Sequence, residues 1–252
     1  MASAVIVVPC YNEEKRLDVA RFSKFTSSPH DITFLFVNDG STDGTLGLIE
    51  SLKKSNPGKF RVLNILQNRG KAEAVRDGFL AAFDSRPDYV GFWDADLATP
   101  LETIPEFLDV AENRPEIEMI IGSRVKLLGR KIERRRSRHY LGRVFATAVS
   151  ASLGLDVYDT QCGAKLFRAS PSIKTLFQQP FYSRWIFDVE ILARLIQARR
   201  GKGLRQAEEV IYEFPLVEWR DIPGSKLGYG DFVRAAWELF RIHNDYFRNP
   251  EC

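Results

Sequence analysis

The sequence predicts an α/β fold in which helices flank a mostly parallel β-sheet. Short, continuously apolar runs alternate with segments of helical periodicity along the chain, and most of these runs end in turn-forming residues. Continuous apolar runs are typical of parallel strands buried on both faces, and their alternation with helices favours a covered sheet. The 252 residues are 44% hydrophobic and 27% charged, which is enough for a sizeable core. We therefore expect a single domain spanning residues 1–252.

The first half of the chain predicts five strands separated by four helices. The strands are expected at 4–8, 32–37, 60–66, 89–93 and 117–121. The helices are expected to end near Phe25, Lys54, Phe83 and Leu108. Asn12 is a suitable N-cap for the first helix, and Thr99 or Pro100 for the start of the fourth.

The second half predicts longer helices and shorter strands. Helical spacing is expected at 140–155, from 183 to beyond 192, and at 227–247, while a turn and strand are expected at 159–168. Two strand-like pieces at 210–219 are separated by Pro215. No window holds about 18 uninterrupted apolar residues and the N-terminus lacks signal-peptide features, so we expect neither a transmembrane helix nor a secretory signal.

Charge and cysteine content exclude several classes of protein. The formal net charge of +3 is too small to predict nucleic-acid binding. Cys10, Cys162 and Cys252 are scattered, which predicts no disulfide framework or zinc site and favours a reducing compartment. The glycines form neither the dinucleotide-binding pattern nor the phosphate loop.

Two carboxylates, Asp94 and Asp96, follow the buried strand at 89–93 directly. Open α/β sheets bind ligands at this kind of edge, where their strands end. Paired carboxylates there favour a hard cation such as Mg²⁺ or Mn²⁺, held partly by substrate phosphates. The alternative is an ordinary acidic turn, because Asp is common in turns and at helix caps.

Other polar residues also follow predicted strands, so the sheet is expected to bring them to one crevice. They are Tyr11, Asn12, Asp39, Asp43, Asn68, Lys71, Ser123 and Arg124. Acids for a metal, amides, turn N–H groups and a few cations together suit a nucleoside diphosphate bound through a divalent ion.

The stretch 124–143 is strongly basic, with nine Lys or Arg residues against the single acid Glu133. It predicts either a solvated charged surface or a site for an anion or anionic membrane. Further along, Asp188 and Glu190 are too close in sequence to share a helix face. We expect one to enter the crevice and the other to be solvated or to bind a nearby cation. The three histidines show no metal-ligand spacing.

Three motifs taken together make the sequence recognisable: Pro9-Cys-Tyr-Asn-Glu13, Val37-Asn-Asp-Gly-Ser-Thr-Asp43 and Asp94-Ala-Asp96. In this order they resemble glycosyltransferase family 2, with its nucleotide-sugar-binding GT-A fold. Four later motifs look more like the dolichyl-phosphate β-glucosyltransferase branch than the mannose-transferring one. They are Gly122-Ser-Arg124, Asp159-Thr-Gln-Cys-Gly163, Arg184-Trp-Ile-Phe-Asp188 and Gly224-Ser-Lys226. Two departures from that branch are noted: we expect no counterpart of its N-terminal membrane helix in these residues, and Ala164 stands where an aromatic is usual.

The resemblance implies roles for particular residues. Residues 1–123 would bind the nucleotide-sugar, and 124–252 would bind the acceptor and add the C-terminal helices. The implied nucleotide-binding residues are Pro9, Tyr11, Asn12, Glu13, Asp39, Lys71 and Asp94. Asp96 would ligate Mg²⁺ or Mn²⁺, and Asp94, Asp96 and Asp188 form the implied catalytic set. Arg124, Arg138 and Lys226 would bind phosphates of the acceptor or donor.

The resemblance implies an inverting transfer of a sugar, with glucose expected, from a UDP-sugar to a polyprenyl or dolichyl phosphate at the cytoplasmic face of a membrane. A phosphate acceptor is already ionised and needs cations more than a base. A non-enzymatic nucleotide-binding or membrane-docking protein is a further alternative, which the intact Asp94 and Asp96 speak against. Two alternative enzymes stay open. One is a soluble family 2 enzyme acting on a sugar or protein hydroxyl, for which Asp188 would be the general base. The other is transfer from GDP-mannose to polyprenyl phosphate.

Overall fold

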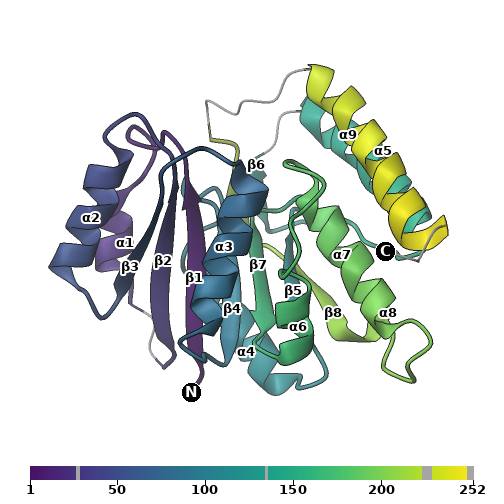
Figure 1. Cartoon of the computed structure of the whole chain (residues 1–252), viewed down its shortest axis with the longest axis horizontal. Helices are drawn as coiled ribbons and strands as arrows, with labels where there is room; N and C mark the ends of the chain where they lie inside the picture. Colours follow the sequence, from purple (N-terminus) through teal and green to yellow (C-terminus); the bar gives the residue numbers. More distant parts are fainter. Residues whose placement is uncertain (27–28, 134–135, 223–228, 249–252) are drawn as a thin grey trace.

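A seven-stranded sheet forms the centre of the molecule (Figure 1). The computed structural model describes residues 1–26, 29–133, 136–222 and 229–248, and their side chains except those of 136–140 and 229–233. The strand order is β3-β2-β1-β4-β7-β5-β8. The strands are β1 (Ser3–Cys10), β2 (Asp31–Asp39), β3 (Phe60–Ile65), β4 (Tyr89–Trp93), β5 (Met119–Ser123), β7 (Ala164–Arg168) and β8 (Ile211–Pro215).

One strand of this sheet, β7, runs against its neighbours. It pairs antiparallel with β4 on one side and β5 on the other, while the other pairs in the sheet are parallel. Trp93 at the end of β4 lies opposite Ala164 at the start of β7. The residues that precede β7 therefore lie at the same edge as the carboxyl ends of the parallel strands, where the polar residues were predicted to gather.

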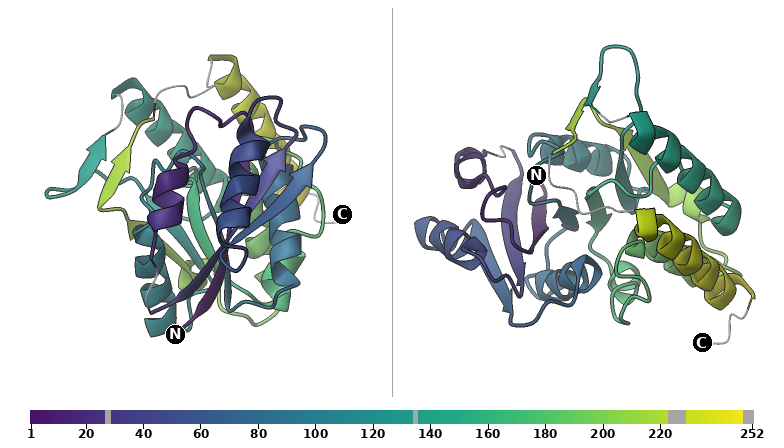
Figure 2. Two further views of the ribbon diagram at one scale, coloured as in Figure 1. Left: turned by 90° about the vertical axis from the view of Figure 1, so that its left-hand side faces the viewer. Right: turned by 90° about the horizontal axis from the view of Figure 1, so that it is seen from above.

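Helices cover both faces of the sheet and divide the core in two (Figures 1 and 2). On one face lie α3 (Lys71–Phe83), α6 (Pro171–Thr175), α7 (Phe187–Arg199) and α8 (Ala207–Val210). On the other lie α1 (Val19–Lys24), α2 (Thr45–Ser55) and α4 (Thr103–Asn113). Fully buried aromatic rings fill the core on both faces, among them Phe79 and Phe167 on one and Phe34 and Phe36 on the other.

A helical pair and a two-stranded ribbon extend this body. The helices α5 (Arg136–Leu153) and α9 (Tyr229–His243) contact each other and α7, and α9 continues into one π-helical segment, η1 (Asn244–Arg248). The short strands β6 (Lys131–Glu133) and β9 (Glu218–Arg220) pair in parallel to form a separate two-stranded ribbon. Figure 2 shows this ribbon and its preceding loop projecting from the body. Among the described residues, no helix has both the length and the apolarity needed to cross a membrane.

The predicted fold class and the first-half strands are confirmed, but three helices start later than predicted. One is α7, which begins at Phe187 and not at residue 183. The first helix begins at Val19, capped by Asp18, whose side chain accepts from the Arg21 N–H. Asn12 instead accepts from the Thr42 N–H (2.9 Å), so its side chain joins two loops and caps no helix. The fourth helix begins at Thr103.

The segment before Thr103 is held in turns by contacts that sequence spacing does not reveal. The Trp93 indole donates to the Thr99 carbonyl (3.0 Å), and the Arg220 N–H donates to the Ala98 carbonyl (3.1 Å). Elsewhere, β6, α6 and α8 were not predicted, because each has only three to five residues. Ala164 is fully buried in the core, so this departure from the family pattern does not line the crevice.

Candidate active site

A pocket of about 270 Å³ lies where β4, β7, α5, α7 and the ribbon meet. Its lining includes Asp94, Asp96 and Asp188, the three carboxylates predicted to be catalytic. It also includes four cations: Lys71, Arg124, Arg143 and Arg184. The fold therefore brings the predicted catalytic acids together with basic residues from both halves of the chain.

Asp94 is positioned by three contacts. Its backbone N–H donates to the Gly163 carbonyl (2.9 Å), which continues the β4–β7 pairing beyond the strands. Its carboxylate packs so closely on Gly163 that a Cβ at residue 163 would overlap it. Its Oδ1 pairs with Lys71 Nζ at 2.5 Å. Although burial opposes it, the charge of Asp94 helps raise the pKa of Lys71, which therefore stays a cation.

Asp96 is the better candidate for a metal ligand. Its Oδ1 accepts the Ala98 N–H (3.1 Å), which is a local turn contact rather than an ion pair. Burial, and next the charge of Asp94, raise the pKa of Asp96. Two neighbouring carboxylates disfavour each other's charged form, which raises the pKa, and a divalent ion bound beside them would reverse this shift.

The donor set fits a metal that is shared with a substrate. The described residues contain no group of three or more His, Cys, Asp or Glu side chains arranged to hold an ion. An ion at Asp96 would thus need ligands from outside the protein. Mg²⁺ suits such a site, because it is commonly bound through one or two carboxylates plus substrate phosphates and water.

Asp188 lies at the first turn of α7 and is held by a lysine that the sequence analysis missed. Lys165 of β7 is fully buried, and its Nζ pairs with Asp188 Oδ1 (2.6 Å) and donates to the Cys162 carbonyl (2.7 Å). Burial raises the pKa of Asp188, although Lys165 and Lys71 oppose this shift. A lysine among the apolar residues of β7, before its terminal Arg168, was the available signal for this pair.

Glu190 binds a nearby cation, as expected for whichever of Asp188 and Glu190 does not enter the crevice. It is fully buried, and its carboxylate accepts from Arg194 Nη2 (2.8 Å), the Tyr246 hydroxyl (3.0 Å) and the Tyr182 N–H (2.9 Å). It therefore binds a cation outside the pocket, whereas Asp188 enters the pocket.

The arginines at the pocket differ in how far they are engaged by the protein. Arg124 forms a two-nitrogen ion pair with Asp159, through Nε (2.6 Å) and Nη2 (2.7 Å), and among the described residues nothing engages its Nη1. Arg143 stacks its guanidinium on the Tyr158 ring (3.8 Å to the centroid) and donates to the Tyr158 carbonyl. Arg184 is exposed and donates through Nε to the Arg69 carbonyl (3.1 Å).

The structure does not describe the side chains of two predicted phosphate-binding residues. Lys226 falls outside the described residues, and the side chain of Arg138 is outside the described side chains. Phosphate binding by Arg124, Arg138 and Lys226 stays a prediction.

The predicted nucleotide-binding residues at the ends of β1 and β2 lie beside the pocket lining. Asp39 is buried and accepts from the Arg69 N–H (2.8 Å), the Gly70 N–H (2.8 Å) and the Asn68 side chain (2.9 Å). Asp39 therefore fixes the turn before α3, and this turn positions Lys71 to pair with Asp94. Base recognition by Asp39 stays a prediction, and it would have to coexist with these bonds.

The other members of that set join neighbouring loops. The Asn12 N–H donates to the Ser41 hydroxyl (3.1 Å), and the Glu13 N–H donates to the Thr45 hydroxyl (2.8 Å). Pro9 and Tyr11 are partly exposed at the same sheet edge. Nucleotide binding by Pro9, Tyr11, Asn12 and Glu13 stays a prediction.

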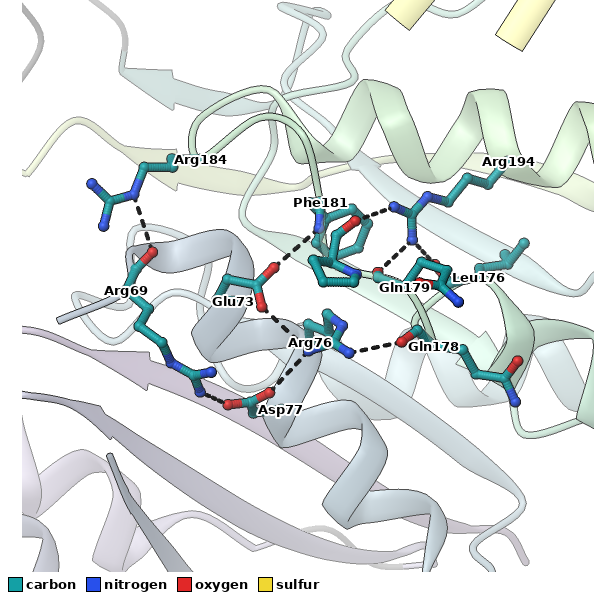
Figure 3. Close-up of polar contacts among 11 residues, drawn as sticks. Arg69, Glu73, Arg76, Asp77, Leu176, Gln178, Gln179, Phe181, Arg184 and Arg194 are labelled. Atoms are coloured by element: carbon teal, nitrogen blue, oxygen red, sulfur yellow. Dashed lines mark hydrogen bonds and ion pairs between the residues drawn. The ribbon is translucent and has the colours of Figure 1, made fainter. Parts of the chain in front are cut away.

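A polar network ties the segment at 176–186 to α3 and α7 (Figure 3). Glu73 of α3 accepts the Phe181 N–H (3.0 Å), and Arg76 donates to the Gln178 carbonyl (2.7 Å). From the other side, Arg194 donates to the carbonyls of Leu176, Gln179 and Pro180. The segment ends in Arg184 and Trp185, which line the pocket, so this network positions part of the site.

Comparison with known proteins identifies the family. A model described as glycosyl transferase family 2 matches residues 5–176, more than half of the chain. The chain belongs to glycosyl transferase family 2. It is therefore a glycosyltransferase.

Curated relatives in this family match most of the chain. A dolichyl-phosphate β-glucosyltransferase of Trichomonas vaginalis is 32% identical over 254 residues, covering 96% of this chain and 71% of the relative. That of Saccharomyces cerevisiae is 32% identical over 265 residues, covering 96% and 74%. That of Mus musculus is 34% identical over 236 residues, covering 88% and 68%.

Solved structures support the fold. Glucosyl-3-phosphoglycerate synthase of Mycobacterium tuberculosis, in complex with Mn²⁺, UDP and glucosyl-3-phosphoglycerate, aligns with a TM-score of 0.64 at 21% identity. The match covers 96% of this chain and 80% of the synthase. A mannosyltransferase of Pyrobaculum calidifontis, bound to GDP-Man and Mn²⁺, aligns with a TM-score of 0.57 at 16% identity and covers 95% and 62%. The family 2 chain thus has the GT-A fold.

Proposed function

We propose that this glycosyltransferase transfers glucose from UDP-glucose to dolichyl phosphate or a similar polyprenyl phosphate, with inversion at the anomeric carbon. The observation that carries the proposal is the pocket itself, where Asp94, Asp96 and Asp188 face Arg124, Arg143 and Arg184. Such a site suits two anionic partners, a nucleoside diphosphate leaving group and a phosphate nucleophile. The names of the curated relatives support both the sugar and the acceptor.

The acids divide the chemistry of the donor between them. Asp96 would hold Mg²⁺ or Mn²⁺, which supplies charge neutralisation of the leaving diphosphate when bound. Asp94, fixed by Lys71 and Gly163, would orient the sugar or ribose. Lys71 would add a second positive charge near the diphosphate. The Mn²⁺ and UDP in the mycobacterial synthase support this arrangement by analogy of fold.

The acceptor would approach from the side of the arginines. A phosphate monoester is ionised at neutral pH, so its oxygen attacks without a strong base, and displacement opposite the diphosphate inverts the anomeric carbon. Arg143 and Arg184 would hold the acceptor phosphate by charge-assisted hydrogen bonds. Because Asp188 is already paired with Lys165 at 2.6 Å, its main effect would be to keep the buried lysine and Lys71 in place.

A hydroxyl acceptor is the second candidate, and one observation favours it. Burial raises the pKa of Asp188, and a carboxylate with a raised pKa is a stronger general base. Asp188 also lines the pocket. Transfer from GDP-mannose is a third possibility, supported by the archaeal mannosyltransferase bound to GDP-Man.

A donor screen with polyprenyl phosphate as acceptor tests the proposal. UDP-glucose, UDP-galactose and GDP-mannose would each be incubated with the chain and Mg²⁺ or Mn²⁺, and products read by mass spectrometry. We expect glucosyl polyprenyl phosphate from UDP-glucose, and none after EDTA treatment. If only GDP-mannose gave product, the enzyme would instead be a mannosyltransferase. With a lipid acceptor, the reaction would take place at the cytoplasmic face of a membrane, where nucleotide-sugars are available.

A further inference from the structure

The loop before β6 presents two leucines to solvent on an ordered turn. Leu128 is 104% exposed and Leu127 is 48% exposed. The Arg130 N–H donates to the Leu127 carbonyl (3.2 Å), which closes the turn, and Gly129 adopts the left-handed φ of +80° that the turn requires. The loop that carries them projects from the body (Figure 2), and two adjacent exposed leucines on such a loop require an explanation.

Cations flank the leucines in the sequence, and one of them, Arg130, also interacts electrostatically with Glu106 of α4. Lys126 and Lys131 are exposed, Arg130 is partly exposed, and the six residues 126–131 contain no acid. Lipid surfaces bind segments that combine these features, because apolar side chains enter the boundary of the acyl region while Lys and Arg meet anionic head groups.

The turn is joined rigidly to the pocket. Lys131 at the start of β6 donates its N–H to the Val217 carbonyl (2.8 Å), and β6 then pairs with β9. Trp219 of β9 lines the pocket, and its ring lies 5.2 Å from the Arg124 guanidinium. The Arg220 N–H bonds the Ala98 carbonyl, two residues beyond Asp96. A partner surface that binds this turn would therefore lie beside the pocket.

A bilayer fits this tip better than a protein does. A stable protein interface buries roughly 800 Å² on each partner, and a single convex turn offers only a small fraction of that area. A fluid bilayer closes around a convex tip without needing a complementary shape. The cations also favour an anionic partner.

We propose that the turn at 127–130 docks the enzyme on anionic membranes by inserting Leu127 and Leu128 among the lipid head groups. This surface goes beyond the proposed reaction, because it is a binding site for bulk lipid and does not depend on which acceptor the pocket takes.

Vesicle sedimentation with the full chain tests the docking turn. The vesicles would be phosphatidylcholine with about one third phosphatidylserine, compared with phosphatidylcholine alone. We expect the double variant Leu127→Gln with Leu128→Gln to weaken binding to the anionic vesicles at least tenfold. Lys126→Gln with Lys131→Gln should weaken it by roughly fivefold for each lysine, and this loss should shrink at high salt.

The loop at 200–206 provides a matched control. It carries the exposed Leu204 (49%) together with Lys202 and Arg205, so its composition is similar. It lies at the opposite edge of the sheet, because Arg199 joins the Arg205 carbonyl to Glu118, which precedes β5. Leu204→Gln should change vesicle binding less than twofold.

Several results would overturn the proposal. They are failure of the wild-type chain to bind anionic vesicles at low salt, unchanged binding in the double leucine variant, or an equal loss in Leu204→Gln. A lipid-free dimer that the double leucine variant dissociates would assign the turn to self-association instead.

A second variant guards against a folding defect. In Leu128→Trp, the new indole should shift its fluorescence to the blue on anionic vesicles and be quenched by brominated acyl chains, after subtraction of the wild-type signal. Absence of quenching in a variant that still sediments with the vesicles would also overturn the insertion.

Discussion

Asp94 and Asp96 lie two residues apart but have different surroundings. Asp94 is bound on three sides, by Lys71, by Gly163 and through its own backbone N–H. Asp96 has one turn contact, to Ala98, and burial and the charge of Asp94 raise its pKa. The arrangement favours Asp96 as the metal ligand and Asp94 as the positioned neighbour.

Replacing Asp96 by Asn tests the metal ligand. The side chain keeps its size but loses the charge that a hard cation needs, so we expect turnover to fall by roughly 100-fold or more with the melting temperature preserved. Steady-state kinetics at increasing Mn²⁺ would measure it. The matched control is Asp84→Asn, an exposed residue just beyond α3, which should leave turnover unchanged. Wild-type turnover in Asp96→Asn at limiting Mn²⁺ would remove Asp96 from the metal site.

Replacing Gly163 by Ala tests how Asp94 is positioned. The new methyl group would overlap the Asp94 carboxylate, so either that side chain or the β4–β7 edge must move. We expect turnover to fall at least tenfold, since displacements of about 1 Å at a reacting centre have large effects. Gly47→Ala is the control, because a Cβ at residue 47 of α2 meets no atom within 4 Å and Ala favours helix. Equal activity of the two variants would contradict the positioning by Gly163.

The Asp188–Lys165 pair predicts a pH effect on stability. Burial raises the pKa of Asp188 in the folded chain above its unfolded value, although Lys165 and Lys71 oppose the shift and Asp94 adds to it. The stability due to this carboxyl is then full below the unfolded pKa of about 3.9 and is lost as pH rises through the folded pKa. Asp188→Asn cannot ionise, so its unfolding free energy relative to wild type should improve as pH rises from about 4. Urea unfolding across pH would show this trend, and a flat difference would refute the raised pKa.

At the scale of elements, α3 connects the donor and acceptor sides of the site. Its first residue, Lys71, pairs with Asp94, and the turn before it is fixed by Asp39. Two residues further on, Glu73 accepts the Phe181 N–H and so holds the backbone of the segment that carries Arg184 (Figure 3). Displacing α3 would therefore disturb both sides of the pocket together.

Glu73→Ala tests this connection. It leaves the Phe181 N–H without its partner, which commonly costs about 1–3 kcal/mol for a buried polar group. It also removes one contact of Arg76, which keeps its contacts with Asp77 and the Gln178 carbonyl. We expect a lower melting temperature and a raised KM for the acceptor, because Arg184 loses its support, with a smaller change in KM for the donor. Glu50→Ala on the outer side of α2 removes only a surface pair with Lys53 at 3.8 Å and should leave both KM values unchanged. If Glu73→Ala had the wild-type KM for the acceptor, the Glu73 network would not be needed to position Arg184 at the pocket.

At the scale of the molecule, the sequence predicts what depends on local pattern. The apolar runs locate strands β1 to β5, and Asp94 and Asp96 at the end of one run locate the site. The antiparallel direction of β7 depends on long-range pairing, so spacing alone did not reveal that Gly163 would meet Asp94. The partner of Asp188 was missed for the same reason, since Lys165 and Asp188 are brought together only when α7 packs on the sheet.

The sequence also does not reveal which cations are already paired. Arg124 and Arg143 reach the pocket, as expected for a basic stretch near the crevice, yet the Arg124 guanidinium is largely engaged by Asp159. Arg184 was noted only as part of a family motif, and its place at the pocket depends on the segment held by Glu73. Side-chain pairing of this kind is decided by tertiary structure.

A comparison of two acceptors measures the central claim most directly. UDP-[¹⁴C]glucose and Mn²⁺ would be supplied with either a polyprenyl phosphate or the matching polyprenol, which differs only in lacking the phosphate. If the arginines of the pocket select an ionised phosphate, label should enter the lipid with the phosphate acceptor, Asp96→Asn should abolish the transfer, and the polyprenol should give at least 100-fold less product. Equal labelling of the two lipids, or transfer to sugar or protein hydroxyls with neither lipid labelled, would contradict the claim and favour Asp188 as the base of a hydroxyl-directed enzyme.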